Sequence, residues 1–75
     1  MTTVNIRLTT LEDVRRFVNT VTKYDIEIDL CSGRYVVDAK SIMGIFSLDL
    51  LSPIGLIAHT ENADALFEGI AKFVV

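Results

Sequence analysis

The chain switches several times between two spacings of apolar residues, one typical of strands and one typical of helices. In residues 2–8 apolar and polar side chains alternate, which indicates a strand with one buried face. In residues 11–21 the apolar side chains recur every three or four positions, which indicates an amphipathic helix. Thr10 precedes this helix and Asp13 lies three residues later, so the two predict a capping box with Asp in place of Glu.

The same two spacings continue to the end of the chain. Ser32-Gly33 is a turn signal between two strands, and the connection is short enough to predict a hairpin. Ser41 is the expected N-cap of a short helix that ends before Pro53, and Thr60 or Asn62 is the expected cap of the last helix. The remaining predicted elements are strands at residues 26–31, 35–37 and 54–59 and helices at residues 41–50 and 63–74.

This order of elements, βαββαβα, predicts an α+β fold. We expect an open-faced sandwich, in which a four-stranded antiparallel sheet carries three helices on one face. The other face would be solvated, which explains the polar residues Asn5, Arg7, Glu27 and Asp29 on the predicted sheet. A length of 75 residues fits a single domain, expected to span residues 1–75.

Composition excludes several classes of function. The chain has one cysteine, Cys31, and one histidine, His59, so neither an internal disulfide nor a cysteine-rich zinc site is expected. A net charge of -3 argues against nucleic-acid binding. No apolar run approaches a membrane span, and the N-terminus does not resemble a signal peptide. We therefore expect a cytoplasmic protein that uses no metal or other cofactor.

The short helix carries more apolar residues than one buried stripe needs. At helical spacing Ile45 and Leu48 fall on one side, whereas Met43, Phe46 and Leu50 fall on another. The second stripe is a candidate partner surface, for a second copy as well as for another protein. From the pattern alone, the alternative that Met43 and Phe46 pack under a neighbouring loop is favoured.

Three side chains are candidates for chemistry. Ser41 stands at a helix start, where a phosphate would gain from free N–H groups, although a plain N-cap is the simpler interpretation. His59 has the chemistry of a phosphoryl acceptor or general base, but a surface histidine in a strand is favoured. Cys31 is interpreted as an ordinary strand residue.

Two segments resemble a known family. Residues 40–48, KSIMGIFSL, are close to the signature KSIMGVMSL of HPr, the histidine-containing phosphocarrier protein of the bacterial sugar phosphotransferase system. Residues 20–25, TVTKYD, resemble the TASKYD-like segment of the same family. The resemblance covers nearly the whole chain, and it implies the same βαββαβα fold.

The phosphohistidine motif of this family is altered. The family carries its phosphohistidine in a motif of the type GxHARPA. When this chain is aligned with the family by counting back from Ser41 without gaps, the histidine of the motif falls on Thr10, the arginine on Glu12 and the proline on Asp13. Threonine cannot form a phosphoramidate, and Glu12 would repel a phosphoryl group. The comparison therefore implies no catalytic residue at this site, and loss of phosphohistidine carrier activity.

A second role of the family is regulatory. In low-GC Gram-positive bacteria the serine of KSIMG is phosphorylated by the HPr kinase/phosphorylase, and the phosphoprotein acts with a catabolite-control transcription factor. The resemblance implies that Ser41 is the phosphorylation site, and that partners dock on the helix behind it. The implied docking residues are Ile42, Met43, Phe46 and Leu50. Glu12 stands where the family has an arginine that helps this docking, and Arg15 or Arg16 is the candidate to replace it.

Three hypotheses result. The chain is a regulatory protein of the phosphotransferase and carbon-catabolite system, an active phosphocarrier that uses another residue, or an assembly domain of the same fold without phosphotransfer. None of them makes the chain an enzyme. The implied partners are the HPr kinase/phosphorylase, a catabolite-control regulator or other proteins of the phosphotransferase system.

Overall fold

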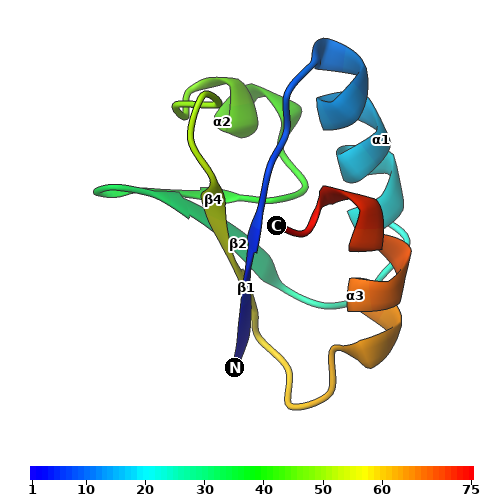
Figure 1. Cartoon of the computed structure of the whole chain (residues 1–75). Coiled ribbons are helices and arrows are strands. Elements are labelled where there is room, and N and C mark those ends of the chain that lie inside the picture. The colour runs from blue at the N-terminus through cyan, green and yellow to red at the C-terminus, as the bar shows by residue number, and fades with distance from the viewer.

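The polypeptide folds into one antiparallel sheet with helices on a single face, as the order of elements predicted (Figure 1). A computed structural model describes all 75 residues. Figure 1 shows α1 and α3 side by side along the sheet, with α2 at one end of it. The elements are β1 (Thr2–Ile6), α1 (Leu11–Val21), β2 (Ile28–Ser32), β3 (Tyr35–Asp38), α2 (Ile42–Phe46), β4 (Ile54–Ala58), α3 (Asp64–Gly69) and a short 3-10 helix (Ala71–Phe73).

The strand order in the sheet is β1-β4-β2-β3, and every neighbouring pair is antiparallel. Period-two alternation sends every second side chain toward the helices, as the buried Ile54, Leu56 and Ala58 of β4 show. Asn5, Arg7 and Glu27 are exposed and Asp29 is half-buried, which agrees with a solvated outer face.

The core lies between the sheet and the helices, and it contains no buried polar or charged residue. Phe17 of α1 is fully buried at its centre and meets the ring of Phe73 edge-on, with 5.8 Å between the ring centroids. Seventeen residues are buried: Ile6, Leu8, Val14, Phe17, Val21, Ile28, Leu30, Ala39, Ile45, Leu48, Ile54, Leu56, Ala58, Ala63, Leu66, Ile70 and Phe73.

The predicted capping box at the start of α1 is confirmed. Thr10 Oγ1 accepts a hydrogen bond from the backbone N–H of Asp13 at 3.0 Å. Asp13 Oδ2 in turn accepts from the backbone N–H of Thr10 at 3.3 Å and of Thr9 at 3.1 Å. One threonine and one aspartate therefore satisfy three backbone donors at this helix start.

The predicted hairpin is also confirmed, because Ser32 pairs with Tyr35 across a two-residue loop. Gly33 has a φ of +60°, and it is the only residue of the chain with a positive φ. Glycine with positive φ at the first loop position is typical of a type II′ turn, whose twist matches that of the two strands. The turn signal in the sequence thus has a specific conformational cause.

The second helix is shorter than the spacing predicted. It ends at Phe46, whereas the apolar pattern predicted a helix through residue 50. Ser47 donates its hydroxyl hydrogen bond to the carbonyl of Gly44 at 2.6 Å, and Asp49 Oδ1 accepts from the N–H of Leu51 at 3.0 Å. These side-chain bonds favour turns over a continuing helix, so Pro53 is not what ends it.

The prediction of one long final helix is wrong in its extent. α3 ends at Gly69, and a 3-10 turn follows instead of further α-helix. The N-cap residue is Ala63, which has no capping side chain, although Asn62 Oδ1 accepts from the N–H of Asp64 at 3.1 Å. β2 likewise begins at Ile28, two residues later than expected.

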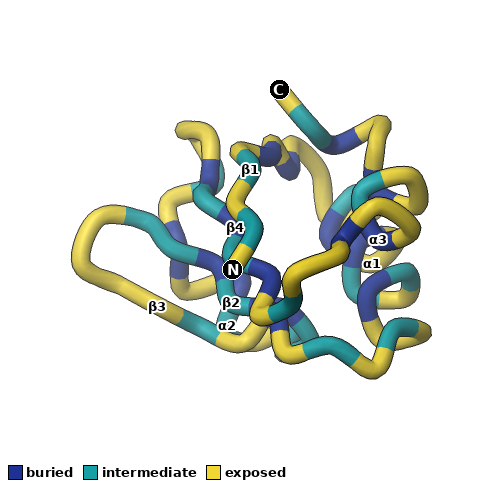
Figure 2. Tube along the Cα trace, turned by 90° about the horizontal axis from the view of Figure 1, so that it is seen from below, coloured by how far each residue is buried: buried dark blue, intermediate teal, exposed yellow.

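The two edges of the sheet differ. At the β1 edge the N–H of Val75 donates to the carbonyl of Asn5 at 3.0 Å, and the N–H of Arg7 donates to the carbonyl of Phe73 at 2.8 Å. The C-terminal segment therefore covers part of β1. At the opposite edge Figure 2 shows β3 and its turn as a largely exposed stretch away from α1 and α3.

Candidate functional site

The start of α1 is capped by side chains of the chain itself. Thr10 and Asp13 close the capping box there, so the Asp13 carboxylate already accepts from the backbone N–H groups of Thr9 and Thr10 and would repel an incoming phosphoryl group. Glu12 is exposed beside them and pairs with Arg16 at 3.2 Å, one turn along the helix. The carboxylates of Glu12 and Asp13 thus lie at this helix start, and neither Thr10 nor its neighbours has an imidazole that could act as a nucleophile.

Ser41 is the N-cap of α2, as predicted. Its Oγ accepts a hydrogen bond from the backbone N–H of Gly44 at 3.1 Å, and the residue is half-buried. Gly44 allows α2 to approach β3 closely, because a Cβ there would lie 3.2 Å from the Cβ of Val37 and 3.3 Å from Ser41 Oγ. The glycine of the KSIMG segment is therefore explained by close packing around the cap.

The surface of α2 is apolar and open. Met43 is 77% exposed and Phe46 is 43% exposed, and we call these two residues the α2 patch. Ile45 and Leu48 are buried, as the helical spacing predicted. Ile42 and Leu50 are half-buried against the core, and Leu50 lies beyond the end of the helix. The alternative that Met43 and Phe46 pack under a loop is therefore wrong.

Few positive charges are free near Ser41. Lys40 Nζ donates to the backbone carbonyl of Tyr24 at 2.7 Å, which ties the segment before α2 to the end of α1. Arg16 is paired with Glu12, whereas Arg15 forms no ion pair. Of the two predicted arginines, Arg15 is therefore the one that would meet a new negative charge without first breaking an ion pair.

His59 has a carboxylate partner that sequence reasoning missed. Its Nε2 lies 2.8 Å from Asp29 Oδ2, and both side chains are about one-third exposed. The β2–β4 register, in which Asp29 faces Ile57, places His59 diagonally from Asp29. No local motif carries this contact, since the two residues are brought together only by the pairing of two distant strands. The pair holds one ring nitrogen of His59 and leaves Nδ1 without a hydrogen bond.

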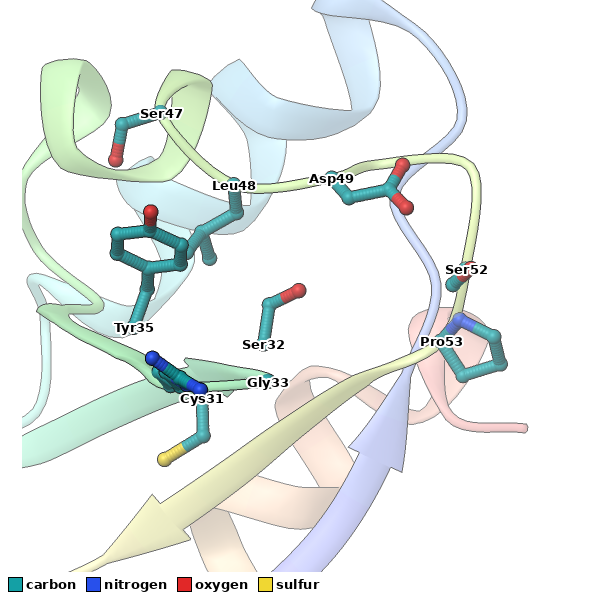
Figure 3. A pocket seen from close by; sticks show the side chains of 10 residues that line it. Cys31, Ser32, Gly33, Tyr35, Ser47, Leu48, Asp49, Ser52 and Pro53 are labelled. Carbon is teal, nitrogen blue, oxygen red and sulfur yellow. The ribbon is translucent and has the colours of Figure 1, made fainter.

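An open hollow of about 670 Å³ lies between the β2–β3 turn and the loop that leads from α2 to β4 (Figure 3). Its lining is mostly polar, with Ser47 and Asp49 from the loop and Arg34 from the turn. In Figure 3 the thiol of Cys31 points to the opposite side of the strand from the hydroxyl of Ser32. Cys31 is thus a half-buried residue of the outer sheet face, in agreement with its interpretation as an ordinary strand residue.

Comparison with known proteins identifies the family. Residues 13–75 match the sequence model of PTS-HPr, described as the PTS HPr component phosphorylation site. The chain belongs to the HPr family. The match begins three residues after Thr10, so it leaves out the position that aligns with the phosphohistidine. A comparison with curated proteins found no match.

Solved structures of HPr proteins have the same fold. HPr-C-His from Thermoanaerobacter tengcongensis is 26% identical, with a TM-score of 0.79 over 96% of this chain and 89% of the other. A phosphocarrier protein HPr from Bacillus anthracis str. Ames is also 26% identical, with a TM-score of 0.74 over 99% of this chain and 94% of the other. The predicted fold and the predicted family are confirmed.

Membership in the family supports protein partners in general, since HPr proteins are phosphocarriers that work with other proteins and are not themselves enzymes. The side chains of His, Cys, Asp and Glu form no group of three or more that could hold a metal ion. None of the helices combines the length and apolar character needed to cross a bilayer.

Proposed function

We propose that this HPr-family protein is a regulatory or interaction protein of the bacterial phosphotransferase and carbon-catabolite system. In this proposal it docks partners through the α2 patch, is phosphorylated on Ser41 and does not carry phosphohistidine. The observation that carries the proposal is the contrast between two helix starts. The patch behind Ser41 is open, whereas a carboxylate already occupies the start of α1.

The α2 patch has the chemistry of a docking surface. Methionine adapts to irregular partner surfaces, and an aromatic ring supplies a large apolar area at little cost in side-chain entropy. Met43 and Phe46 project from a helix whose other side is fixed in the core by the fully buried Ile45. A partner would therefore meet two exposed apolar side chains on a helix that is anchored in the core.

Phosphorylation of Ser41 would change the charge beside this surface. A phosphate adds a charge of about -1.5 to -2 and three strong acceptor oxygens. The N–H of Gly44, which now donates to Ser41 Oγ, is a donor within reach of the modified side chain. Of the two arginines predicted to support the phosphoserine, only Arg15 has no ion pair to break.

The modification is tested by incubating the protein with an HPr kinase and ATP and measuring the mass added. We expect one phosphate on the native chain and none on Ser41→Ala. Ser47→Ala is the matched control, because Ser47 is an exposed serine at the other end of α2 and its loss should leave the reaction unchanged. Phosphate that persists in Ser41→Ala would refute this part of the proposal.

Docking is tested separately with the catabolite-control regulator and the phosphorylated protein. Phe46→Asp places a charge in the patch and should weaken binding by at least about tenfold, which corresponds to about 1.4 kcal/mol. Val75→Asp makes the same type of change at an exposed C-terminal residue and should leave binding unchanged. If Ser41→Ala binds as well as the phosphorylated native protein while Phe46→Asp does not, the chain is instead an assembly domain without phosphotransfer.

One observation favours a second candidate, a phosphocarrier that uses His59. Asp29 orients the imidazole through Nε2, and this leaves Nδ1 available as a nucleophile. In such a step a phosphoryl group would pass from the phosphohistidine of the system's first enzyme to this nitrogen. Acid-labile phosphate after treatment with that enzyme and phosphoenolpyruvate, lost in His59→Ala, would establish this function. We expect no such labelling.

A further inference from the structure

One edge of the sheet remains open for another strand. β3 is the edge strand opposite to β1, and no segment of the chain covers it in the way that the C-terminal residues cover β1. An edge strand presents a row of unpaired backbone groups, which can pair with a strand from another chain. Tyr35 and Val36 on this strand are 69% and 61% exposed.

The hairpin register fixes which backbone groups point outward. Ser32 and Tyr35 flank the two-residue turn and form a hydrogen-bonded pair, so Tyr35 and Val37 direct their N–H and carbonyl groups toward β2. The alternate residues of the strand, Val36 and Asp38, direct theirs away from the sheet. The carbonyl of Asp38 is already used by the N–H of Ser41 at 3.0 Å. Val36 therefore offers both its N–H and its carbonyl to a partner strand.

The side chains on this edge are complementary to themselves. When the strand pairs antiparallel with a copy of itself about Val36, Arg34 lies opposite the partner's Asp38, and the reverse pair forms by symmetry. Neither Arg34 nor Asp38 has an ion pair within the protomer, where the two ion pairs are Arg16–Glu12 and His59–Asp29. Asp38 Oδ1 accepts from the N–H of Lys40 at 2.8 Å, which leaves Oδ2 for the arginine.

The opposite face of the strand is also compatible with this register. Tyr35 lies opposite the partner's Val37, and Val37 lies opposite the partner's Tyr35. Aromatic and β-branched residues form favourable cross-strand pairs. At the two-fold axis Val36 of one copy faces Val36 of the other, so the outward N–H and carbonyl groups of the two residues can form hydrogen bonds with each other.

We propose that a second copy of this chain binds along β3, so that the two sheets join into one eight-stranded antiparallel sheet. The two-fold axis is perpendicular to the sheet, and both α2 patches therefore lie on the same side of the dimer. The inference does not depend on the proposed phosphorylation or docking. The pairing strand has only four residues, Tyr35–Asp38, so the contact is small and the dimer weak.

The test is sedimentation equilibrium of the full chain from about 10 μM to about 1 mM, a range suited to an interface below the standard size. We expect a reversible dimer. Arg34→Asp or Asp38→Arg alone places like charges opposite each other and should raise the dissociation constant about tenfold or more. The double variant R34D/D38R restores opposite charges and should return the dissociation constant to within about threefold of the native value.

Two controls separate this edge from other contacts. Arg15→Asp makes the same charge change at an exposed position of α1 and should leave the dimer unchanged. Val36→Pro removes an outward donor that the β2–β3 ladder does not use, so it should abolish the dimer while the circular dichroism spectrum stays native. A native chain that is monomeric at about 1 mM, or a dimer that Arg34→Asp and Val36→Pro leave intact, would overturn the proposal.

Discussion

Gly69, the last residue of α3, is placed so that one added methyl group has two opposed effects. A Cβ on this residue would lie 2.5 Å from the hydroxyl oxygen of Tyr24 and 3.5 Å from Cγ2 of Thr20. The Tyr24 hydroxyl donates a hydrogen bond to the carbonyl of Ala65 at 3.2 Å and so ties the end of α1 to α3. The φ of Gly69 is not in the left-handed region, so alanine can adopt this backbone conformation.

The magnitudes decide the sign of the effect. Alanine is about 1 kcal/mol more favourable than glycine inside a helix, and we expect about half of this gain at Gly69, the final residue of α3. The methyl group must push the Tyr24 hydroxyl away, which removes its hydrogen bond to Ala65, about 1 kcal/mol, and part of the packing of a half-buried ring. We therefore expect Gly69→Ala to lower the free energy of unfolding by about 0.5–1 kcal/mol.

The sign should reverse when the hydroxyl is absent. In a Tyr24→Phe background the nearest remaining atom of residue 24 lies 3.4 Å from the added Cβ, an ordinary contact. Gly69→Ala should then raise the free energy of unfolding by about 0.5 kcal/mol, which gives a coupling of about 1–1.5 kcal/mol between the two positions. Urea denaturation of the four proteins measures this cycle. An equal effect of Gly69→Ala in both backgrounds would refute the steric argument.

Three further substitutions test other parts of the structure. Thr10→Ala removes the side-chain cap of α1 and should lower the free energy of unfolding by about 1 kcal/mol, or about 4–8 °C in Tm, in a calorimetric scan. Gly33→Ala should lower it by about 1–2 kcal/mol in urea because φ is +60°, whereas Gly55→Ala, where the added Cβ makes only ordinary contacts, should have a smaller effect. Phe17→Ala should lower it by about 3–5 kcal/mol, and a loss under 1 kcal/mol would contradict its placement against Phe73 at the centre of the core.

Sequence predicted the features that neighbouring residues determine. The capping box needs only Thr10 and Asp13 at the correct spacing, and the hairpin needs only a turn with glycine at a position of positive φ. Ser41 as the N-cap of α2 belongs to the same class. Each of these features is stabilised by hydrogen bonds between residues at most four apart, so the sequence displays it directly.

Features that depend on distant residues were missed or misplaced. The apolar spacing continues through Leu48 and Leu50, but hydrogen bonds of Ser47 and Asp49 turn the chain before a longer helix forms. The spacing at the C-terminus likewise continues past Gly69, where the chain instead turns to place Phe73 against the core and Val75 along β1. The contact between Asp29 and His59 requires the β2–β4 register, and one sequence does not specify how strands are ordered in a sheet.

The segment around Tyr24, which resembles the TASKYD-like segment of the HPr family, packs against two other parts of the chain. Thr20 and Tyr24 both lie against Gly69, and the backbone carbonyl of Tyr24 receives the ammonium group of Lys40. The end of α1 therefore contacts both α3 and the segment before α2. These packing contacts account for the similarity of this segment to the family without a catalytic role for its residues.

The strand order also bears on the order in which the strands pair during folding. The β2–β3 hairpin closes a loop of only two residues, whereas Ile6 of β1 pairs with Ile54 of β4, 48 positions later. Closing long loops costs more entropy and slows folding, so we expect the hairpin to form first, β4 to pair with β2 next and β1 to join last. During that interval the hairpin has two open edges. Folding covers the β2 edge with β4, and the β3 edge stays open in the finished protein.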